Sequence, residues 1–137
     1  MIIFNYETKF DLKSSDRVKD WLMTSINFED RKIDIISFIF CNDDYLLGIN
    51  SKYLKHNTLT DIISFDETLG KTLSGDIFIS IERVRENAGI FKTSFKDELH
   101  RVMIHGVLHF CGYNDKTKEE KHLMREKEDY YLSLRDF

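Results

Sequence analysis

The chain of 137 residues is 42% hydrophobic and 32% charged, and its formal net charge is −4. This balance is typical of a soluble globular protein, so we expect a single domain over residues 1–137. The acidic total argues against the diffuse phosphate binding of strongly basic proteins, although a local basic patch remains compatible with it. No apolar run is long enough for a membrane span and the start lacks a basic leader, which predicts a cytoplasmic protein without membrane partners.

The first half of the chain alternates strand and helix patterns. Residues 2–6 predict a strand. A helix is then expected to begin at a cap formed by Ser14 or Ser15, because the apolar residues after it have helical spacing. Residues 33–41 are rich in β-branched and aromatic residues and predict a strand covered on both faces. A helix over residues 43–54 completes this half.

The next two predicted strands cover residues 60–65 and 75–80, with a glycine-containing loop between them. Ser80 is then expected to cap a helix that ends near Gly89.

Two serine or threonine caps predict the last helices. Ser94, followed by Asp97, begins a long helix that reaches Cys111, and Thr117, followed by Glu120, begins the final one. The sum is an α+β fold, in which a small mixed sheet of about four strands packs with about five helices.

The long helix carries two histidines in apolar surroundings. His105 and His109 are four residues apart, so both lie on one face and can point at one centre. Two buried imidazoles need polar partners. One interpretation is a metal ion, and the other is that each ring bonds a backbone carbonyl or a carboxylate. His100 falls about 140° around the helix from His105, so we expect it to be exposed or to support the site from a distance.

The residues after the helix favour the metal interpretation. Gly112 can adopt the left-handed conformation that ends a helix, so Asp115 is expected to return toward the histidine face. Two nitrogens and one carboxylate oxygen make three ligands, which is the number found in catalytic sites with an open position. The predicted site therefore lies at the end of a buried central helix and consists of His105, His109 and Asp115.

The segment HGVLHFCGYND reproduces the pattern H-G-x-L-H-x-x-G-Y-D-H at His105, Gly106, Leu108, His109, Gly112 and Tyr113, and upstream TDIISF and GDIFIS resemble two strand motifs. Together with Met124 and Glu128, these motifs resemble the YbeY family of bacterial metal-dependent endoribonucleases from about Asn50 to Glu128. The resemblance implies an endoribonuclease that uses one divalent ion in ribosomal RNA processing, at the 3′ end of the small-subunit RNA. It also implies ribosomal RNA, and a ribosomal subunit or assembly factors, as partners, and we expect no DNA substrate.

Two positions depart from the family pattern. The usual third ligand is histidine, whereas this chain has Asn114 and then Asp115. Because a carboxylate adds negative charge, zinc remains the first choice of metal while manganese and iron(II) become more acceptable. The arginine that the family carries before the TDIISF strand is Leu54 here, so the site lacks a bidentate phosphate donor.

Substitutes for that arginine are available nearby. Lys52, Lys55 and His56 can supply positive charge, and Ser64 lies in the strand motif, so we predict these four as substrate-binding residues, with solvated loop residues as the alternative. A wider set of basic residues can form a surface that follows an RNA strand or can be scattered over the protein: Lys52, Lys55, Arg83, Arg85, Lys92, Lys96 and Arg101.

Three other functions fit parts of the pattern. A metallohydrolase of another substrate class would keep the metal, but Gly106 occupies the position of the general-base glutamate in H-E-x-x-H peptidases. A non-catalytic ribosome-assembly factor would use the ion as a structural clamp. An iron(II) oxygenase shares the ligand set but usually places it on a β-barrel. Cys41 and Cys111 are far apart in sequence and predict buried, reduced thiols.

Overall fold

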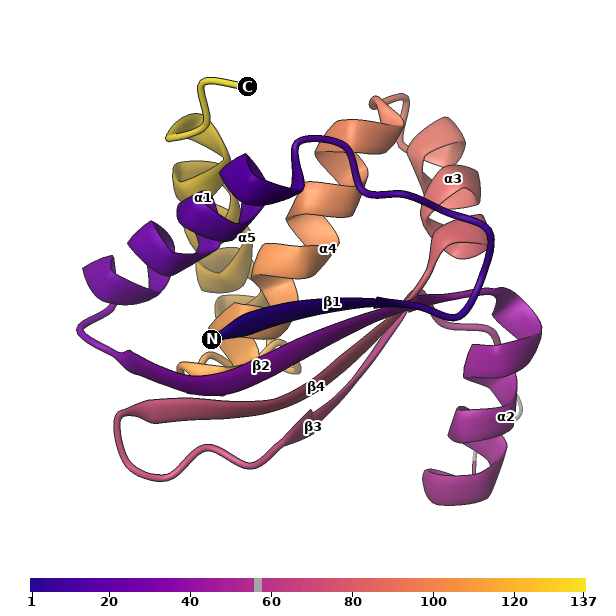
Figure 1. The fold of residues 1–137 in the computed structure, drawn as a ribbon, viewed down its shortest axis with the longest axis horizontal. Coiled ribbons are helices and arrows are strands. Elements are labelled where there is room, and N and C mark those ends of the chain that lie inside the picture. Colours follow the sequence, from indigo (N-terminus) through magenta and orange to yellow (C-terminus); the bar gives the residue numbers. More distant parts are fainter. Residues whose placement is uncertain (56–57) are drawn as a thin grey trace.

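The computed structural model describes residues 1–55 and 58–137, which form a mixed sheet and the helices around it (Figure 1). The strands are β1 (Ile2–Tyr6), β2 (Lys32–Cys41), β3 (Ile62–Asp66) and β4 (Thr72–Ser80). The helices are α1 (Ser15–Phe28), α2 (Asp43–Tyr53), α3 (Ile81–Ile90), α4 (Phe95–Phe110) and α5 (Lys118–Ser133). The predicted α+β architecture is therefore confirmed.

The sheet has the strand order β1-β2-β4-β3. β1 and β4 both pair with β2 in parallel, while β3 pairs with β4 in the antiparallel direction. The antiparallel edge follows from the short connection between β3 and β4, because parallel neighbours need a longer crossover. β2 and β4 are consequently central, and Ile36, Phe38 and Phe40 of β2 are buried.

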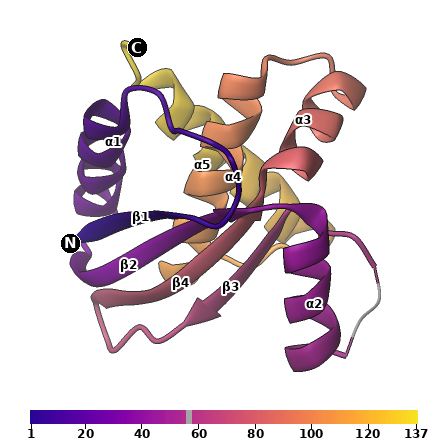
Figure 2. The ribbon, with the colours of Figure 1, turned by 45° about the vertical axis from the view of Figure 1, so that its right-hand side comes forward.

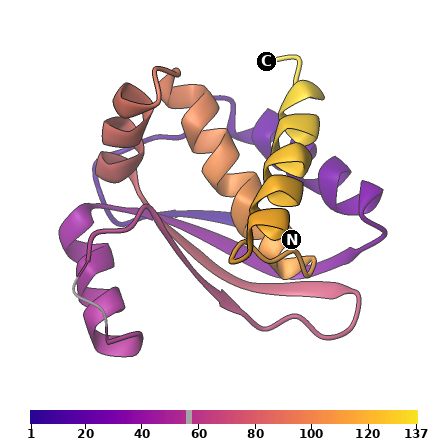
Figure 3. The ribbon, with the colours of Figure 1, turned by 180° about the vertical axis from the view of Figure 1, so that it is seen from behind.

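Helices α1, α3, α4 and α5 lie on one side of the sheet, with α4 between the sheet and α5 (Figures 1 and 3). The main hydrophobic core fills this layer and joins α4 residues such as Met103 and Leu108 to Ile77 and Ile79 of β4. α2 packs on the opposite face, where Leu46 contacts a smaller cluster with Ile63 and Cys41. Figure 2 shows α2 standing apart from the other helices at one end of the sheet.

The caps of the later helices form as predicted. The side chains of Ser80 and Ser94 accept hydrogen bonds from the backbone of Arg83 and Asp97, and Thr117 and Glu120 form a complete capping box. The prediction that a serine side chain caps α1 is wrong. Ser14 stands at the N-cap position, but its backbone is left-handed (φ 53°) and its side chain makes no capping hydrogen bond.

The strand boundaries differ modestly from those predicted. β4 begins at Thr72 rather than at residue 75, because its first residues pair with the start of β2. β3 begins at Ile62 rather than at residue 60. None of the described helices is long and apolar enough to cross a membrane.

Candidate metal centre

α4 places both histidines at the edge of the core. Met103, Ile104, Val107 and Leu108 are almost fully buried, as a helix enclosed on most sides requires. The histidine side chains are instead 22% (His105) and 28% (His109) exposed. The two imidazoles therefore open toward solvent from a helix that is otherwise held rigidly by packing.

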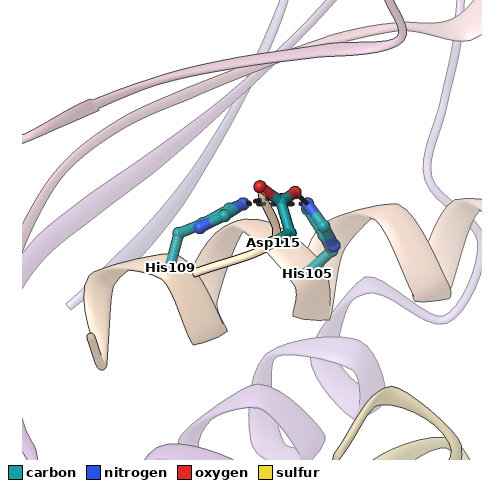
Figure 4. Close-up of side chains that lie close together, drawn as sticks. All are labelled: His105, His109 and Asp115. Atoms are coloured by element: carbon teal, nitrogen blue, oxygen red, sulfur yellow. Dashed lines mark hydrogen bonds and ion pairs between the residues drawn. The ribbon is translucent and has the colours of Figure 1, made fainter. Parts of the chain in front are cut away.

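The chain turns back after α4 and brings in the carboxylate. Gly112 has a φ of 100°, which favours glycine, and the backbone amide of Tyr113 donates to the carbonyl of Leu108. Asp115 Oδ2 consequently lies 3.1 Å from His105 Nε2 and 3.2 Å from His109 Nε2 (Figure 4). The predicted juxtaposition of the three residues is thus present.

The other nitrogen of each ring is held by an acceptor. His105 Nδ1 lies 2.7 Å from Glu128 Oε2, and His109 Nδ1 lies 2.9 Å from the backbone carbonyl of Tyr113. A carbonyl can only accept, so His109 must carry a hydrogen on Nδ1, and the carboxylate of Glu128 favours the same tautomer for His105. In the neutral tautomers both Nε2 atoms therefore present lone pairs.

With these tautomers, the space between the two histidines and Asp115 is surrounded by acceptor atoms and lacks a positive charge. The two Nε2 atoms are 2.9 Å apart and both approach the Asp115 carboxylate, so three acceptors converge without a donor between them. A proton or a metal ion at the centre would relieve this arrangement. Two nitrogen ligands about 2.05 Å from a tetrahedral zinc ion are about 3.3 Å apart, so the observed separations of 2.9–3.2 Å are slightly shorter than such a donor set requires, and the cluster would open slightly around an ion.

The electrostatics of His105 agree with a site for a cation. Burial alone disfavours its imidazolium, but the hydrogen bond to Glu128 and the charges of Glu128, Asp115 and Asp61 outweigh burial and raise its pKa. The same carboxylates that stabilise a proton would stabilise a bound metal ion, which must displace that proton. His105, His109 and Asp115 can therefore hold a metal ion.

Glu128 is itself anchored from a second side. Its side chain is 7% exposed, and its Oε1 accepts from Arg101 at 2.9 Å. Arg101 also bonds Asp129 at 2.7 Å. The sequence motif marked Glu128, but its contact with His105 joins residues on two helices and could not be inferred from spacing.

A cavity of about 180 Å³ adjoins the cluster and is lined by Asp61, Glu98, Arg101, His105 and Glu128, among others. Burial raises the pKa of Asp61, and burial together with the charge of Asp61 raises that of Glu98. Carboxyl groups of this kind can hold and release a proton nearer to neutral pH than exposed ones. No sequence pattern pointed to Glu98, because the first turn of a helix such as α4 is an ordinary position for an acid.

Gly106, which lies between the two histidines, is tightly packed against the sheet. A Cβ atom at Gly106 would lie 3.0 Å from the Cδ1 atoms of both Ile62 and Ile77. The sheet therefore packs directly on this glycine. A glutamate here would have to displace two core side chains, which strengthens the sequence argument against a zinc-peptidase mechanism.

The predicted substrate-binding residues are less closely connected to the cluster. Ser64 is half-buried in β3 and shares a strand face with Ile62, which meets α4. Lys52 and Lys55 are exposed at the end of α2, and the Lys52 ammonium lies 5.2 Å from the centroid of the Tyr53 ring. Among the described residues, no hydrogen bond or ion pair joins these three side chains to the cluster. His56 lies outside the described residues.

Two further histidines are now placed. The expectation for His100 is wrong, because its side chain is buried in the core, where it accepts a hydrogen bond from Arg135 and contacts Trp21. α1 covers the part of α4 that helical spacing left open to solvent. His122 is exposed and pairs with Glu126 along α5.

Comparisons with known proteins agree with these motifs. The family model of the endoribonuclease YbeY matches residues 3–135. A protein named endoribonuclease YbeY from Flavobacterium psychrophilum is 54% identical over 98% of this chain and 96% of its own length. Another of that name, from Christiangramia forsetii, is also 54% identical, over 97% of this chain and 93% of its own length.

A solved structure shares the fold. The solution structure of TM1509 from Thermotoga maritima superimposes with a TM-score of 0.70 and 26% identity, covering 97% of this chain and 87% of the other. Because the family model spans nearly all of the chain and close relatives match from end to end, the chain belongs to the endoribonuclease YbeY family.

Proposed function

We propose that this protein is a metal-dependent endoribonuclease that cleaves single-stranded ribosomal RNA, at the 3′ end of the small-subunit RNA, in the cytoplasm. Its proposed partners are that RNA and the ribosomal subunit or assembly factors that carry it. Zinc is the proposed ion, with manganese or iron(II) as substitutes. Membership of the family supports the RNA substrate, and the donor set supports the ion.

One observation carries the proposal of a metal. His105, His109 and Asp115 aim three acceptor atoms at one point, while the outer nitrogens of both rings are held by acceptors. Metal-binding histidines typically donate their second N–H to a carboxylate or a carbonyl in this way. Isolated core histidines have no reason to share a carboxylate and face each other as well.

The chain's own residues would orient the site. Glu128 fixes the tautomer of His105 and raises its basicity, and the Tyr113 carbonyl fixes that of His109. A divalent ion held there would supply Lewis acidity toward a phosphodiester. Three protein ligands leave a coordination position for the substrate or for water.

RNA binding is proposed to begin at the predicted residues Lys52, Lys55, His56 and Ser64. The first two are exposed and make no ion pair with the described residues, so they are available to a phosphate. Because lysine is a point charge without the fork of arginine, we expect this contact to be weaker and less directional than that of the family arginine.

The test is cleavage of ribosomal RNA that contains single-stranded segments, with wild type, Asp115→Ala and Asp16→Ala, after each protein is stripped of metal and supplied with zinc or manganese. Asp16 is an exposed acid in the first turn of α1, so its removal matches the change of charge elsewhere. We expect metal-restored cleavage in wild type and Asp16→Ala, and at least about a 100-fold loss in Asp115→Ala. Equal cleavage by all three proteins would refute the ligand assignment. Folded wild type that binds zinc but never cleaves RNA would indicate a structural ion in an assembly factor.

A further inference from the structure

A second cavity, larger than the one beside the metal centre, opens at the other end of α4. Its volume is about 590 Å³, and it lies between the loop that joins β1 to α1 and the first turns of α4. Figure 2 shows this loop crossing α4. Its lining reaches His100, five residues or about 7.5 Å of helix before His105, but it shares no residue with the lining of the cavity beside the metal centre. The two sites are therefore distinct.

The rim of the cavity is positively charged. Four cations line it: Lys9 and Lys13 of the loop, Arg85 of α3 and Lys96 of α4. Asp11 is the only acidic side chain among the described residues of the lining. Within the described residues, none of these four cations forms an ion pair with a carboxylate. Free cations gathered on one face of a protein with a net charge of −4 indicate a site for an anion.

The wall of the cavity is aromatic. The rings of Phe10 and Phe95 meet edge to face with centroids 6.0 Å apart, and Phe137 lines the same space. The guanidinium of Arg85 lies 4.9 Å from the centroid of Phe95, and the ammonium of Lys96 lies 5.7 Å from that of Phe137. These two cations thus lie beside aromatic faces, an arrangement that suits a ligand with both a flat ring and an anionic group.

His100 also lines the cavity. Its side chain is 3% exposed, and its Nδ1 lies 2.7 Å from an Arg135 nitrogen. An arginine can only donate, so the neutral ring carries its hydrogen on Nε2. A ligand atom within reach of Nε2 can accept that hydrogen.

We propose that this cavity binds a nucleotide, with its base against the phenylalanine rings and its phosphate on the surrounding lysines and arginine. The volume falls within the range of about 300–1,000 Å³ that is usual for small-molecule sites. Two sources have this chemistry: a free mononucleotide, and one nucleotide of a single RNA strand. The proposal concerns binding alone and does not depend on the proposed cleavage.

The experiment measures binding of a fluorescent single-stranded oligoadenylate in excess chelator, with no added metal, so that cleavage cannot contribute. Lys13→Gln/Lys96→Gln removes two rim charges, and Phe95→Leu removes a ring while keeping an apolar side chain. The control Lys32→Gln/Lys71→Gln removes two exposed charges where β2 and β4 begin. AMP, adenosine and inorganic phosphate serve as competitors.

We expect both cavity variants to bind at least about 10-fold more weakly than wild type, given the usual strength of base stacking and of charged hydrogen bonds, while the control pair changes little. Competition by AMP, but not by adenosine or phosphate alone, would identify the free nucleotide as a sufficient ligand. Binding of the oligomer without competition by AMP would identify the RNA strand. Equal binding by all variants, or no binding by folded wild type, would overturn the proposal. Metal-dependent cleavage by the same protein preparations, measured separately with metal added, would then show that the proposed function survives.

Discussion

At the scale of single residues, the contact of Glu128 with His105 links α5 to the metal centre. The carboxylate holds the ring nitrogen that faces away from the cluster, at 2.7 Å, and Arg101 holds the carboxylate in turn. A change at Glu128 should therefore alter metal affinity without removing a ligand.

We predict that Glu128→Gln lowers zinc affinity about 10-fold while the protein stays folded, because a glutamine oxygen still accepts from His105 but no longer adds negative charge. Glu126→Gln is the matched control on the same helix, since Glu126 is exposed and pairs only with His122 among the described residues. Competition with a chromophoric chelator measures both affinities. Wild-type affinity in Glu128→Gln would show that Glu128 only packs against the site.

His100 predicts how the free energy of unfolding depends on pH. Burial, together with the nearby charges of Arg135 and Lys96, lowers its pKa from 6.5 to about 4. Between these values the unfolded chain binds more protons than the folded one, so stability is full above pH 6.5 and falls as the pH is lowered toward 4. The loss from this group should be about 3 kcal/mol.

The variant His100→Gln keeps an acceptor for Arg135 and removes the titration. Urea unfolding across this pH range should show a shallower dependence in His100→Gln than in wild type, and no change in the exposed control His122→Gln. Identical slopes in wild type and His100→Gln would contradict a buried neutral His100.

The sequence predicted correctly the proximity of those site residues that are near one another along the chain. His105, His109, Gly112 and Asp115 lie within eleven residues, so helical spacing and one glycine turn were sufficient to bring them together. Glu128 and Asp61 meet the cluster through tertiary packing. His100 was misplaced for the same reason, because spacing along one helix says nothing of what covers its other faces.

At the scale of the elements, α4 lies between the sheet and α5, and the sheet packs directly on the helix at Gly106. The isoleucines that face this glycine come from β3 and β4. The local signals for caps could be read from the sequence because each depends on residues within a single turn. The exception is Ser14, whose backbone is left-handed and whose side chain makes no capping hydrogen bond.

We predict that Gly106→Ala destabilises the protein by about 1–3 kcal/mol, because its Cβ would press on Ile62 and Ile77. Gly89→Ala is the control within α3: nothing lies within 4 Å of the added atom, so it should raise stability by up to about 1 kcal/mol. Chemical denaturation compares the two. A stabilising Gly106→Ala would mean that α4 can shift away from the sheet at no cost.

At the scale of the whole molecule, the two cysteines lie in the hydrophobic clusters on opposite faces of the sheet, so the reactivity of each measures how readily its face opens. Cys41 belongs to the small cluster under α2, and Cys111 belongs to the main core. Both are free thiols, and burial raises the pKa of each to about 12. The predicted reduced and buried state is confirmed for both.

We predict that neither thiol reacts with a thiol-specific reagent in the native protein at neutral pH, because the reactive thiolate is scarce and access requires opening of the structure. Mass spectrometry after timed labelling, with and without urea, measures each site separately. Complete labelling of either cysteine within seconds in the absence of urea would show that its side of the sheet opens readily.

The whole account depends on one ion bound by His105, His109 and Asp115. The most direct measurement is a calorimetric titration of metal-stripped wild type and Asp115→Ala with zinc, with Asp16→Ala as the control. We predict one ion per chain in wild type and Asp16→Ala, with release of protons on binding, and an affinity about 100-fold lower in Asp115→Ala. Folded wild type that binds no ion, or an Asp115→Ala variant that binds zinc as tightly as wild type, would contradict the account.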